Sequence, residues 1–304
     1  MTPPSSQQAG RSMVEVLVAM AIGLVVLGAV MMSTAGTGGV IRTGDELARL
    51  GDDGQTALNI LTSQLRMAGY SPPRQQVRGG DALRHYDGVP LRGCDHGFVS
   101  VTADAVDALA CAAPGGAGHA AVSILYEADV FDTYPGTAGR PTNCLGNQLG
   151  FAESALGQYT LAENRFFIRT QPATGNPALY CAASSGAGFS SQPLVDNVES
   201  LVMTWGVADP VTDKLGRRMP AGDAVRDLTA AEIDTLYADD PLRWSRVVRV
   251  RICLVMRSPK GLAAEAVAHT GCDGKTVMPA DAADRRLRRA MSATVHLRNR
   301  SGDT

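Results

Sequence analysis

The N-terminal segment Gly10-Arg11-Ser12-Met13-Val14-Glu15 runs straight into the apolar run Val16–Met32, and the architecture of the whole chain depends on it. The run is 17 residues long, counted from 16 to 32, and no charged residue follows Glu15 before Arg42. That length is near the lower limit for a helix that spans a bilayer. A cation before the run and none within it favours a cytoplasmic N-terminus. We therefore expect a single-pass transmembrane helix over residues 11–35.

Glu15 is the unusual residue of this segment, because it places a carboxylate at the mouth of an apolar helix. An unpartnered charge in such a position costs on the order of 2.5 kcal/mol or more. We therefore expect a cationic partner for Glu15.

A glycine, four residues, a glutamate and then an apolar helix resemble the N-terminus of type IV pilins and of the pseudopilins of type II secretion. In that family a prepilin peptidase cuts after the glycine, here Gly10, and N-methylates the new first residue, here Arg11. The family's glutamate, here Glu15, then pairs with the N-terminal amine of a neighbouring subunit. The resemblance implies a leader at 1–10 and a mature chain that starts at Arg11, where the family usually has phenylalanine.

A secretory signal peptide is one alternative, because the small residues Ser33-Thr34-Ala35 follow the apolar run and could be cleaved. An uncleaved anchor is the other. An apolar core of 17 residues is longer than the usual signal-peptide core of about 7 to 15, and an acidic residue at its edge is unexpected there. We therefore favour the pilin interpretation.

Composition fits a large extracytoplasmic head, for which we assign residues 70–304. The chain has 304 residues, of which 45% are hydrophobic, and a net charge of -2. It can bury a core, and it has no global charge bias toward nucleic acid or acidic lipid.

All the cysteines follow the membrane segment: Cys94, Cys111, Cys144, Cys181, Cys253 and Cys272. An even count beyond an N-inside anchor indicates an oxidising compartment and hence disulfides. Six cysteines allow 15 pairings, among which sequence does not choose. We prefer the sequential set, Cys94-Cys111, Cys144-Cys181 and Cys253-Cys272. The alternative is a metal site made of Cys94, His96, Cys111 and His119, which lacks CxxC spacing, so we predict no metal and no cofactor.

Glycines at 36, 38, 39 and 44 each cost about 1 kcal/mol in a helix interior, so we expect a flexible neck over 36–44. Helical periodicity returns over 45–69, where apolar residues recur at three- and four-residue steps. This stripe consists of Leu47, Leu50, Leu58, Leu61, Leu65 and Ala68. Gly69 and Pro72-Pro73 should end the helix. The segment 59–70 resembles the corresponding helix end of the PilW group of minor pilins.

The rest of the chain carries β signals. We expect strands at Ala121–Tyr126, in a hairpin of 164–170 with 178–181, at 246–257 and at 289–297. In the strand at 246–257 the even positions from Val248 to Met256 should face the core and the odd positions solvent. Residues 193–207, read as a turn leading into a strand, and the closing strand again resemble the PilW group. The fold class we expect is α+β, with the long N-terminal helix packed on an antiparallel sheet and with disulfide-tied loops.

Two loop features point to local structure. Thr229-Ala230-Ala231-Glu232 is a capping box that should open a short helix before Pro241. Asp209 and Asp213 lie in a glycine-bearing loop but lack EF-hand spacing, which favours a solvated loop over a calcium site.

Chemistry-bearing motifs are sparse. Six arginines lie between Arg285 and Arg300, but no aromatic residue that could stack on bases accompanies them, so we expect a polar strand face and no nucleic acid partner. The sequence has no P-loop, GxSxG, HExxH or dinucleotide fingerprint, and its five histidines are scattered. We therefore expect no enzyme and no catalytic residues.

Together these features predict a minor pilin that is cleaved by prepilin peptidase and primes or caps type IV pilus assembly. Motility, adhesion or DNA uptake would be downstream roles. Its partners would be other minor pilins and the major pilin, met through the N-terminal helix, and a tip adhesin is a further candidate. We expect it first in the inner membrane with a periplasmic head and then at the pilus tip. The alternatives are a large pseudopilin of a type II secretion tip and, from another class, a membrane-tethered extracytoplasmic binding protein.

Overall fold

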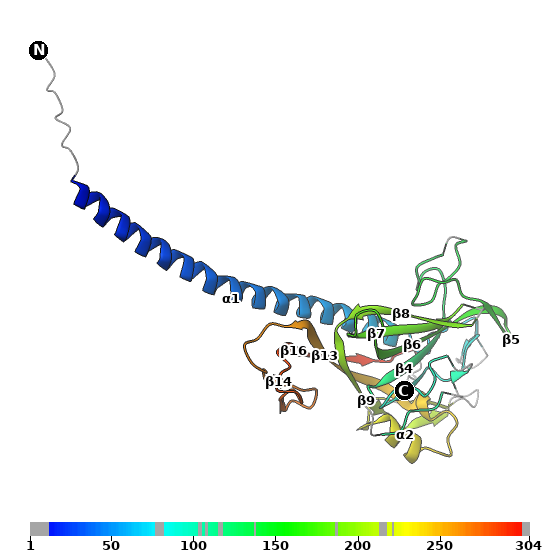
Figure 1. The fold of residues 1–304 in the computed structure, drawn as a ribbon. Coiled ribbons are helices and arrows are strands. Elements are labelled where there is room, and N and C mark those ends of the chain that lie inside the picture. The colour runs from blue at the N-terminus through cyan, green and yellow to red at the C-terminus, as the bar shows by residue number, and fades with distance from the viewer. Residues whose placement is uncertain are drawn as a thin grey trace, which may run out of the picture. The chain divides into compact units, whose positions relative to one another are not determined.

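The computed structural model describes residues 12–76, 82–102, 105–106, 109–114, 118–136, 138–185, 188–212, 218–220 and 222–299. Its helices are α1 (Met13–Met67), α2 (Ala230–Leu236) and the 3-10 helix η2 (Arg243–Arg246). The strands, labelled where possible in Figure 1, are β1 (Gln75–Gln76), β2 (Ala82–Leu83), β3 (Leu91–Cys94), β4 (Ala121–Glu127), β5 (Phe151–Ser154), β6 (Gly157–Thr170), β7 (Pro177–Ser184), β8 (Phe189–Asp196), β9 (Val198–Val207), β10 (Pro210–Thr212), β11 (Arg218–Pro220), β12 (Arg226–Leu228), β13 (Val247–Gly261), β14 (His269–Thr270), β15 (Thr276–Val277) and β16 (Arg286–His296).

The helix α1 is 55 residues long and continues through residues 36–44, where we expected it to weaken. The expected interruption is therefore absent from the backbone, although the flexibility of this segment stays a prediction. Ending a helix leaves up to four carbonyls and four N–H groups without partners, and restarting it requires a costly new nucleus. A few glycines at about 1 kcal/mol each do not outweigh that cost. The chain divides into two compact units, Met1–Ala48 and Arg49–Thr304, and the boundary between them falls within the sequence of α1.

The head part of α1 buries the apolar stripe that its periodicity predicts. Leu58, Leu61 and Leu65 are at most 4% exposed, whereas Leu47, which we placed on the same stripe, is 38% exposed. The helix ends at Met67, and Gly69 then adopts a φ of 70°, which favours glycine. The N–H of Gly69 donates to the carbonyl of Leu125 at 2.8 Å, so the helix end is tied directly to β4.

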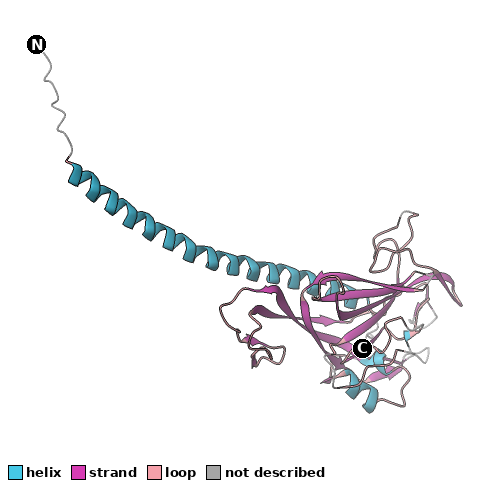
Figure 2. Ribbon diagram, in the orientation of Figure 1, coloured by secondary structure: helices cyan, strands magenta, loops and turns pink. Residues whose placement is uncertain are grey.

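Two antiparallel sheets make up most of the head, where we had expected one (Figure 2). The four-stranded sheet has the order β12-β9-β13-β16, and the larger sheet has the order β3-β4-β6-β7-β8, with β5 paired to β6. The predicted hairpin is present as β6 and β7, with Thr170 opposite Pro177. The predicted strands at 121–126, 246–257 and 289–297 are β4, β13 and β16. Residues 193–196 belong to β8, and the turn before β9 is at Asn197, with a φ of 62°.

One apolar core joins α1 to both sheets. It contains Leu61 and Leu65 of the helix, Phe166 of β6 and Ile252 of β13. Asn164 on β6 also donates to Gln64 of α1 at 2.8 Å. A smaller cluster covers the opposite face of the larger sheet and includes Phe98, Phe167 and Tyr180. With helix and antiparallel sheets sharing a core, the fold is α+β, as predicted.

The strand β13 departs from the predicted alternation. Its even positions are buried, but Cys253 and Val255 on the other face are also only 8% and 6% exposed. Cys253 is covered because it is bonded to Cys272 in the segment that follows the strand. Alternation therefore predicted the core face correctly, and the disulfide buried part of the face that we expected to be wet.

The short helix α2 begins at the predicted capping box. The hydroxyl of Thr229 accepts from the Glu232 N–H at 3.2 Å, and the Glu232 carboxylate accepts from the Thr229 N–H at 2.7 Å. The strand β3, which contacts α2, carries Gly93. A Cβ at this position would lie 2.2 Å from the ring of Trp205. Because that ring is fully buried, glycine is needed for this close approach.

Candidate functional site

Ser12 lies at the N-terminus of α1 and accepts hydrogen bonds from the first turn of the helix. Its carbonyl accepts from the N–H groups of Glu15 and Val16 at 3.0 and 3.3 Å, and its hydroxyl accepts from the Val14 N–H at 3.4 Å. Ser12 therefore caps the helix, and Glu15 lies in the first turn. A carboxylate is favoured there by the partial positive charge of the helix N-terminus. Local structure thus holds Glu15 in the first turn of α1, three residues after Ser12.

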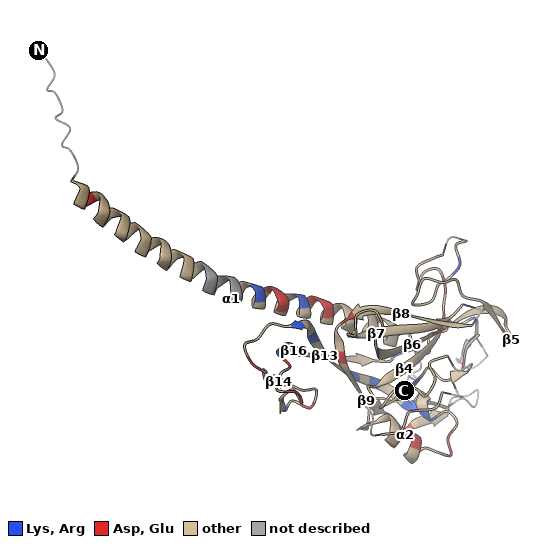
Figure 3. Cartoon of the chain, viewed as in Figure 1, with Lys and Arg blue, Asp and Glu red and all other residues tan. Residues whose placement is uncertain are grey.

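The segment Met13–Ser33 is long and apolar enough to cross a membrane, with a mean hydropathy of 2.6, and no other described segment meets that test. At 1.5 Å per residue its 21 residues extend about 31 Å, close to the hydrocarbon thickness of a bilayer. Its side chains are exposed: Met13 is 83%, Leu24 is 70% and Met32 is 81% accessible. Such a surface requires lipid or other apolar helices around it. Figure 3 shows one acidic residue near the start of α1 and charges of both signs only toward the head.

Gly10 and Arg11 lie outside the described residues. The structure therefore does not test cleavage after Gly10, methylation of Arg11 or the role of Glu15 in subunit assembly. These remain predictions.

The disulfides join Cys94 to Cys111, Cys144 to Cys181 and Cys253 to Cys272, which is the sequential pairing. Their Cα atoms are 5.3, 6.5 and 5.7 Å apart, within the usual range for disulfides. The alternative metal set therefore loses two ligands, because both of its thiols are bonded to each other. Among the described residues no group of three or more His, Cys, Asp or Glu side chains could hold a metal ion. Asp213, the second residue of the calcium alternative, lies outside the described residues.

Two of the C-terminal arginines, Arg286 and Arg288, lie against carboxylates of the head. Glu199 on β9 accepts from Arg288 at 2.6 and 2.9 Å and from Arg257 at 3.3 Å. Asp284 also accepts from Arg288, and its other oxygen lies 3.9 Å from Arg286. Burial alone would raise the pKa of Asp284, but the hydrogen bond from Arg288 and the nearby charges lower it. Sequence reasoning missed Glu199 as the hub of this network, because no local motif marks it.

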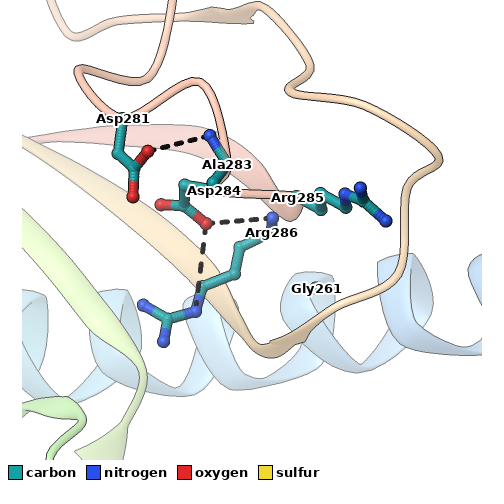
Figure 4. Close-up of a pocket in the computed structure, with 6 residues that line it drawn as sticks. All are labelled: Gly261, Asp281, Ala283, Asp284, Arg285 and Arg286. Atoms are coloured by element: carbon teal, nitrogen blue, oxygen red, sulfur yellow. Dashed lines mark hydrogen bonds and ion pairs between the residues drawn. The ribbon is translucent and has the colours of Figure 1, made fainter.

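A shallow pocket of about 360 Å³ adjoins this network where the chain returns from the loop after β13 (Figure 4). Asp281 accepts from the Ala283 N–H at 2.8 Å, and Asp284 accepts from the Arg286 N–H at 3.1 Å. The carboxylates of the pocket thus accept from backbone N–H groups of the same loop, and Asp284 also lies 3.9 Å from the guanidinium of Arg286.

One serine and one histidine lie close enough to suggest nucleophile chemistry. Ser154 Oγ is 2.8 Å from Nδ1 of His85. The serine hydroxyl also lies 3.1 Å from the carbonyl of Gly157 and accepts from the Leu156 N–H at 3.1 Å, so it is bonded within the turn between β5 and β6. The direction of its bond with His85 depends on the tautomer of the imidazole.

Comparisons with known proteins agree with the features of the helix. A family model described as Type IV Pilus-assembly protein W matches residues 165–299, which include β7 to β16. The match does not extend to segment 59–70, in which we saw a resemblance to the same group. A model described as Prokaryotic N-terminal methylation motif matches residues 5–31 and so contains Gly10, Arg11 and Glu15. No curated protein matches the sequence.

Among solved structures, the type IV-like pilin TTHA1219 from Thermus thermophilus is similar, with 12% identity and a TM-score of 0.39. The match covers 84% of this chain and 98% of that one. The methylation motif at the start, the exposed apolar helix after it and the match to the PilW family over the last part of the head point the same way. The chain is thus similar to the PilW group of type IV pilus proteins over residues 165–299, and its start matches the prokaryotic N-terminal methylation motif.

Proposed function

We propose that the protein is cleaved after Gly10 by prepilin peptidase, is methylated at Arg11 and primes or caps type IV pilus assembly. The observation that carries this proposal is Glu15, the one charged residue of an exposed apolar segment of 21 residues. Cleavage after Gly10 would create an amine four residues before Glu15. In a bundle of such helices, each carboxylate then has a neighbour's amine as its partner in a medium of low dielectric.

The size of the head supports a minor rather than a repeating role. The compact unit that contains it runs from Arg49 to Thr304. A subunit repeated along a thin filament must pack a neighbour above it, and a large head hinders that packing. At a tip or initiation complex few subunits lie above, so the bulk is tolerated. The protein would therefore act once per filament, through its N-terminal helix, together with other minor pilins and the major pilin.

Substitution of Glu15 tests the proposal in a deletion strain complemented with each variant. Glu15→Gln should leave the chain in the membrane, because the apolar run is unchanged, but reduce its entry into filaments. Glu15→Lys should reduce it further, because two cations would then meet at low dielectric. Asp45→Lys is the matched control, since it changes an exposed acid on the same helix beyond the apolar run.

The measurements are the number of pili per cell and the amount of protein in sheared filaments and in membranes. If Glu15→Lys restored normal piliation and was recovered in filaments, the pairing account would be wrong. The membrane-tethered binding protein would then be the better explanation.

A further inference from the structure

The two large sheets of the head end in the strands β3, β8, β12 and β16. β3 and β12 are only four and three residues long, and β8 contains Pro193 and a register shift against β7. Short strands, prolines and bulges keep a sheet edge from pairing with another chain. β16 has none of these features, because it is 11 residues long, contains no proline and pairs with β13 without a register shift from Arg288 to His296. Of these four edges, it is the one suited to accept a further strand.

The hydrogen bonds of β16 show which of its backbone groups face outward. The N–H of Leu297 donates to the carbonyl of Val248 at 2.8 Å, and along an antiparallel pair every second residue bonds to the partner strand. The N–H and C=O groups of Ala290, Ser292 and Thr294 therefore point away from β13. No backbone hydrogen bond joins these three residues to a described residue of another element. They present an unused ladder of donors and acceptors.

The side chains along this edge leave room for an added strand. Ala290, Ser292 and Thr294 are small, and the last two are exposed. Beside the end of the edge lies a pocket of about 390 Å³, which is lined by Arg66, Thr294, Val295, His296 and Arg298. The outward side of β16 is thus hollowed where it approaches the end of α1.

Asn299 fixes the end of β16 against the helix. Its side-chain amide donates to the carbonyl of Arg66 at 2.7 Å and to the carbonyl of Ala68 at 3.2 Å. These bonds also satisfy carbonyls that the helix end leaves without intrahelical partners. The edge and the pocket are therefore held in place before anything binds, which lowers the entropy cost of binding.

The charges around Thr294 select the kind of strand that fits. Arg251 of β13 is exposed and lies opposite Thr294 in the register, so the two side chains project from the same face of the sheet. Arg66, which is also exposed, lines the pocket together with Thr294, and none of the described lining residues is acidic. A carboxylate on an added strand would therefore meet two guanidinium groups here.

A second copy of β16 does not supply that carboxylate. The strand itself carries three arginines and no acidic residue, so two such edges would bring cations together. On the other face of β16, Met291 and Ala293 are half-buried and pack against the core. Alternate side chains of an added strand would lie beside them and should be apolar.

We propose that the edge of β16 binds an extended segment of a different protein, with acidic side chains on the Thr294 face and apolar side chains on the Met291 face. The segment would extend the four-stranded sheet by one strand and would bond to the outward groups of Ala290, Ser292 and Thr294. Main-chain hydrogen bonds would supply affinity, and the alternating side chains would supply specificity. This contact belongs to the head and does not depend on the role proposed for Glu15.

The test measures binding of short fluorescent peptides to the full chain in detergent. The probe alternates valine and glutamate. One control peptide alternates valine and lysine, and the other is the valine–glutamate peptide N-methylated at its amides, which cannot form a ladder. Amide hydrogen exchange locates the binding site, because the N–H groups of Ser292 and Thr294 should exchange more slowly with the probe bound, whereas that of Ala293 already bonds to β13.

Two variants of the protein separate the backbone from the charges. Thr294→Pro removes an outward N–H and no bond to β13, and Thr212→Pro, at an exposed position of β10, is its control. Arg66→Glu with Arg251→Glu reverses the charge beside the edge and keeps every backbone donor. Arg226→Glu with Lys260→Glu is the control with the same change of net charge at exposed positions elsewhere.

We expect the wild type and both controls to bind the glutamate peptide roughly tenfold more tightly than the lysine peptide, and this preference should shrink as salt rises. The N-methylated peptide should not bind. Thr294→Pro should lose at least tenfold in affinity without a change in its unfolding midpoint. The charge-reversed form should prefer the lysine peptide, and this result decides the question if the proline variant does not fold.

The proposal is overturned if the glutamate peptide does not bind the wild type at about 1 mM, or if the N-methylated or lysine peptide binds equally well. It is also overturned if the charge-reversed form keeps the wild-type preference, or if exchange slows at another strand. Sedimentation that showed pairing of two copies through β16 would make a second copy the occupant instead. All these variants keep Gly10, Arg11 and Glu15, so failure here leaves the piliation proposal standing, and failure of the piliation test leaves the peptide result readable.

Discussion

Replacing Asp132 by asparagine should stabilise the head at neutral pH. Asp132 lies in the loop after β4, where its Oδ1 accepts from the Asp129 N–H at 2.8 Å. Its Oδ2 is buried and has no hydrogen-bond partner in the described structure. Burial raises the pKa of Asp132 to about 6, and the charges of Asp129 and Glu127 also raise it. The carboxylate is thus an uncompensated charge, which an amide would remove while keeping the acceptor at Oδ1.

The size of the effect follows from the pKa shift. A change from 3.8 to about 6 corresponds to about 3 kcal/mol at 1.36 kcal/mol per pKa unit. The side chain is only about half buried, so solvent screening reduces the expected gain to about 1.5 kcal/mol. In a head of this size that is an increase of roughly 3 to 6 °C in the unfolding midpoint.

The stability gain of Asp132→Asn should depend on pH, in a direction set by the raised pKa of Asp132. Below pH 3.8 the carboxyl is neutral in both the folded and the unfolded chain, and above about 6 it is charged in both. The folded state therefore bears the penalty fully above pH 6 and loses it as the pH falls toward 4. The gain of Asp132→Asn should be complete at pH 7.5 and mostly gone at pH 4.

Thermal unfolding of the full chain in detergent, followed by circular dichroism at both pH values, measures the gain. Asp239→Asn, at an exposed position, is the control and should change neither midpoint by more than about 1 °C. If Asp132→Asn melted at or below the wild-type temperature at pH 7.5, or gained equally at pH 4, the reasoning would be refuted.

Three further predictions concern the bonds and the processing of the chain. Replacing both Cys253 and Cys272 by serine should lower the free energy of unfolding by about 3 kcal/mol, because the bridge closes a loop with a sequence separation of 19; an unchanged unfolding midpoint would contradict this. Glu199→Gln should lower the free energy of unfolding by about 2 kcal/mol, because Arg257 and Arg288 would lose their shared carboxylate. Glu265→Gln, at an exposed position, is the control and should leave stability unchanged. Equal unfolding midpoints for the two variants would show that the network does not stabilise the head. Mass spectrometry of the mature protein should find methylated Arg11 at its N-terminus, and a chain that starts at Gly36 would instead establish a signal peptide.

Patterns that are local along the chain were predictable from the sequence. The apolar run, the stripe from Leu50 to Ala68 and the capping box at Thr229 each depend on residues within a few turns of one another, so periodicity and capping rules apply directly. The strand at 246–257 was predicted for the same reason. The candidate site followed from Gly10 and Glu15, whose spacing is itself the motif.

Features that depend on residues far apart in the chain were decided only by the tertiary structure. The division into two sheets follows from which strands pair, and alternation in one strand does not specify its neighbour. Cys253 is buried because its disulfide with Cys272 ties a later segment against it. Glu199 pairs with Arg288 across 89 positions. Arg66 and Arg298, which come from opposite ends of the head's sequence, line one pocket. The apolar helix and its amphipathic continuation were therefore readable from neighbours in the chain. The sheet order and the Glu199 ion-pair network form only when the folded core brings distant residues together.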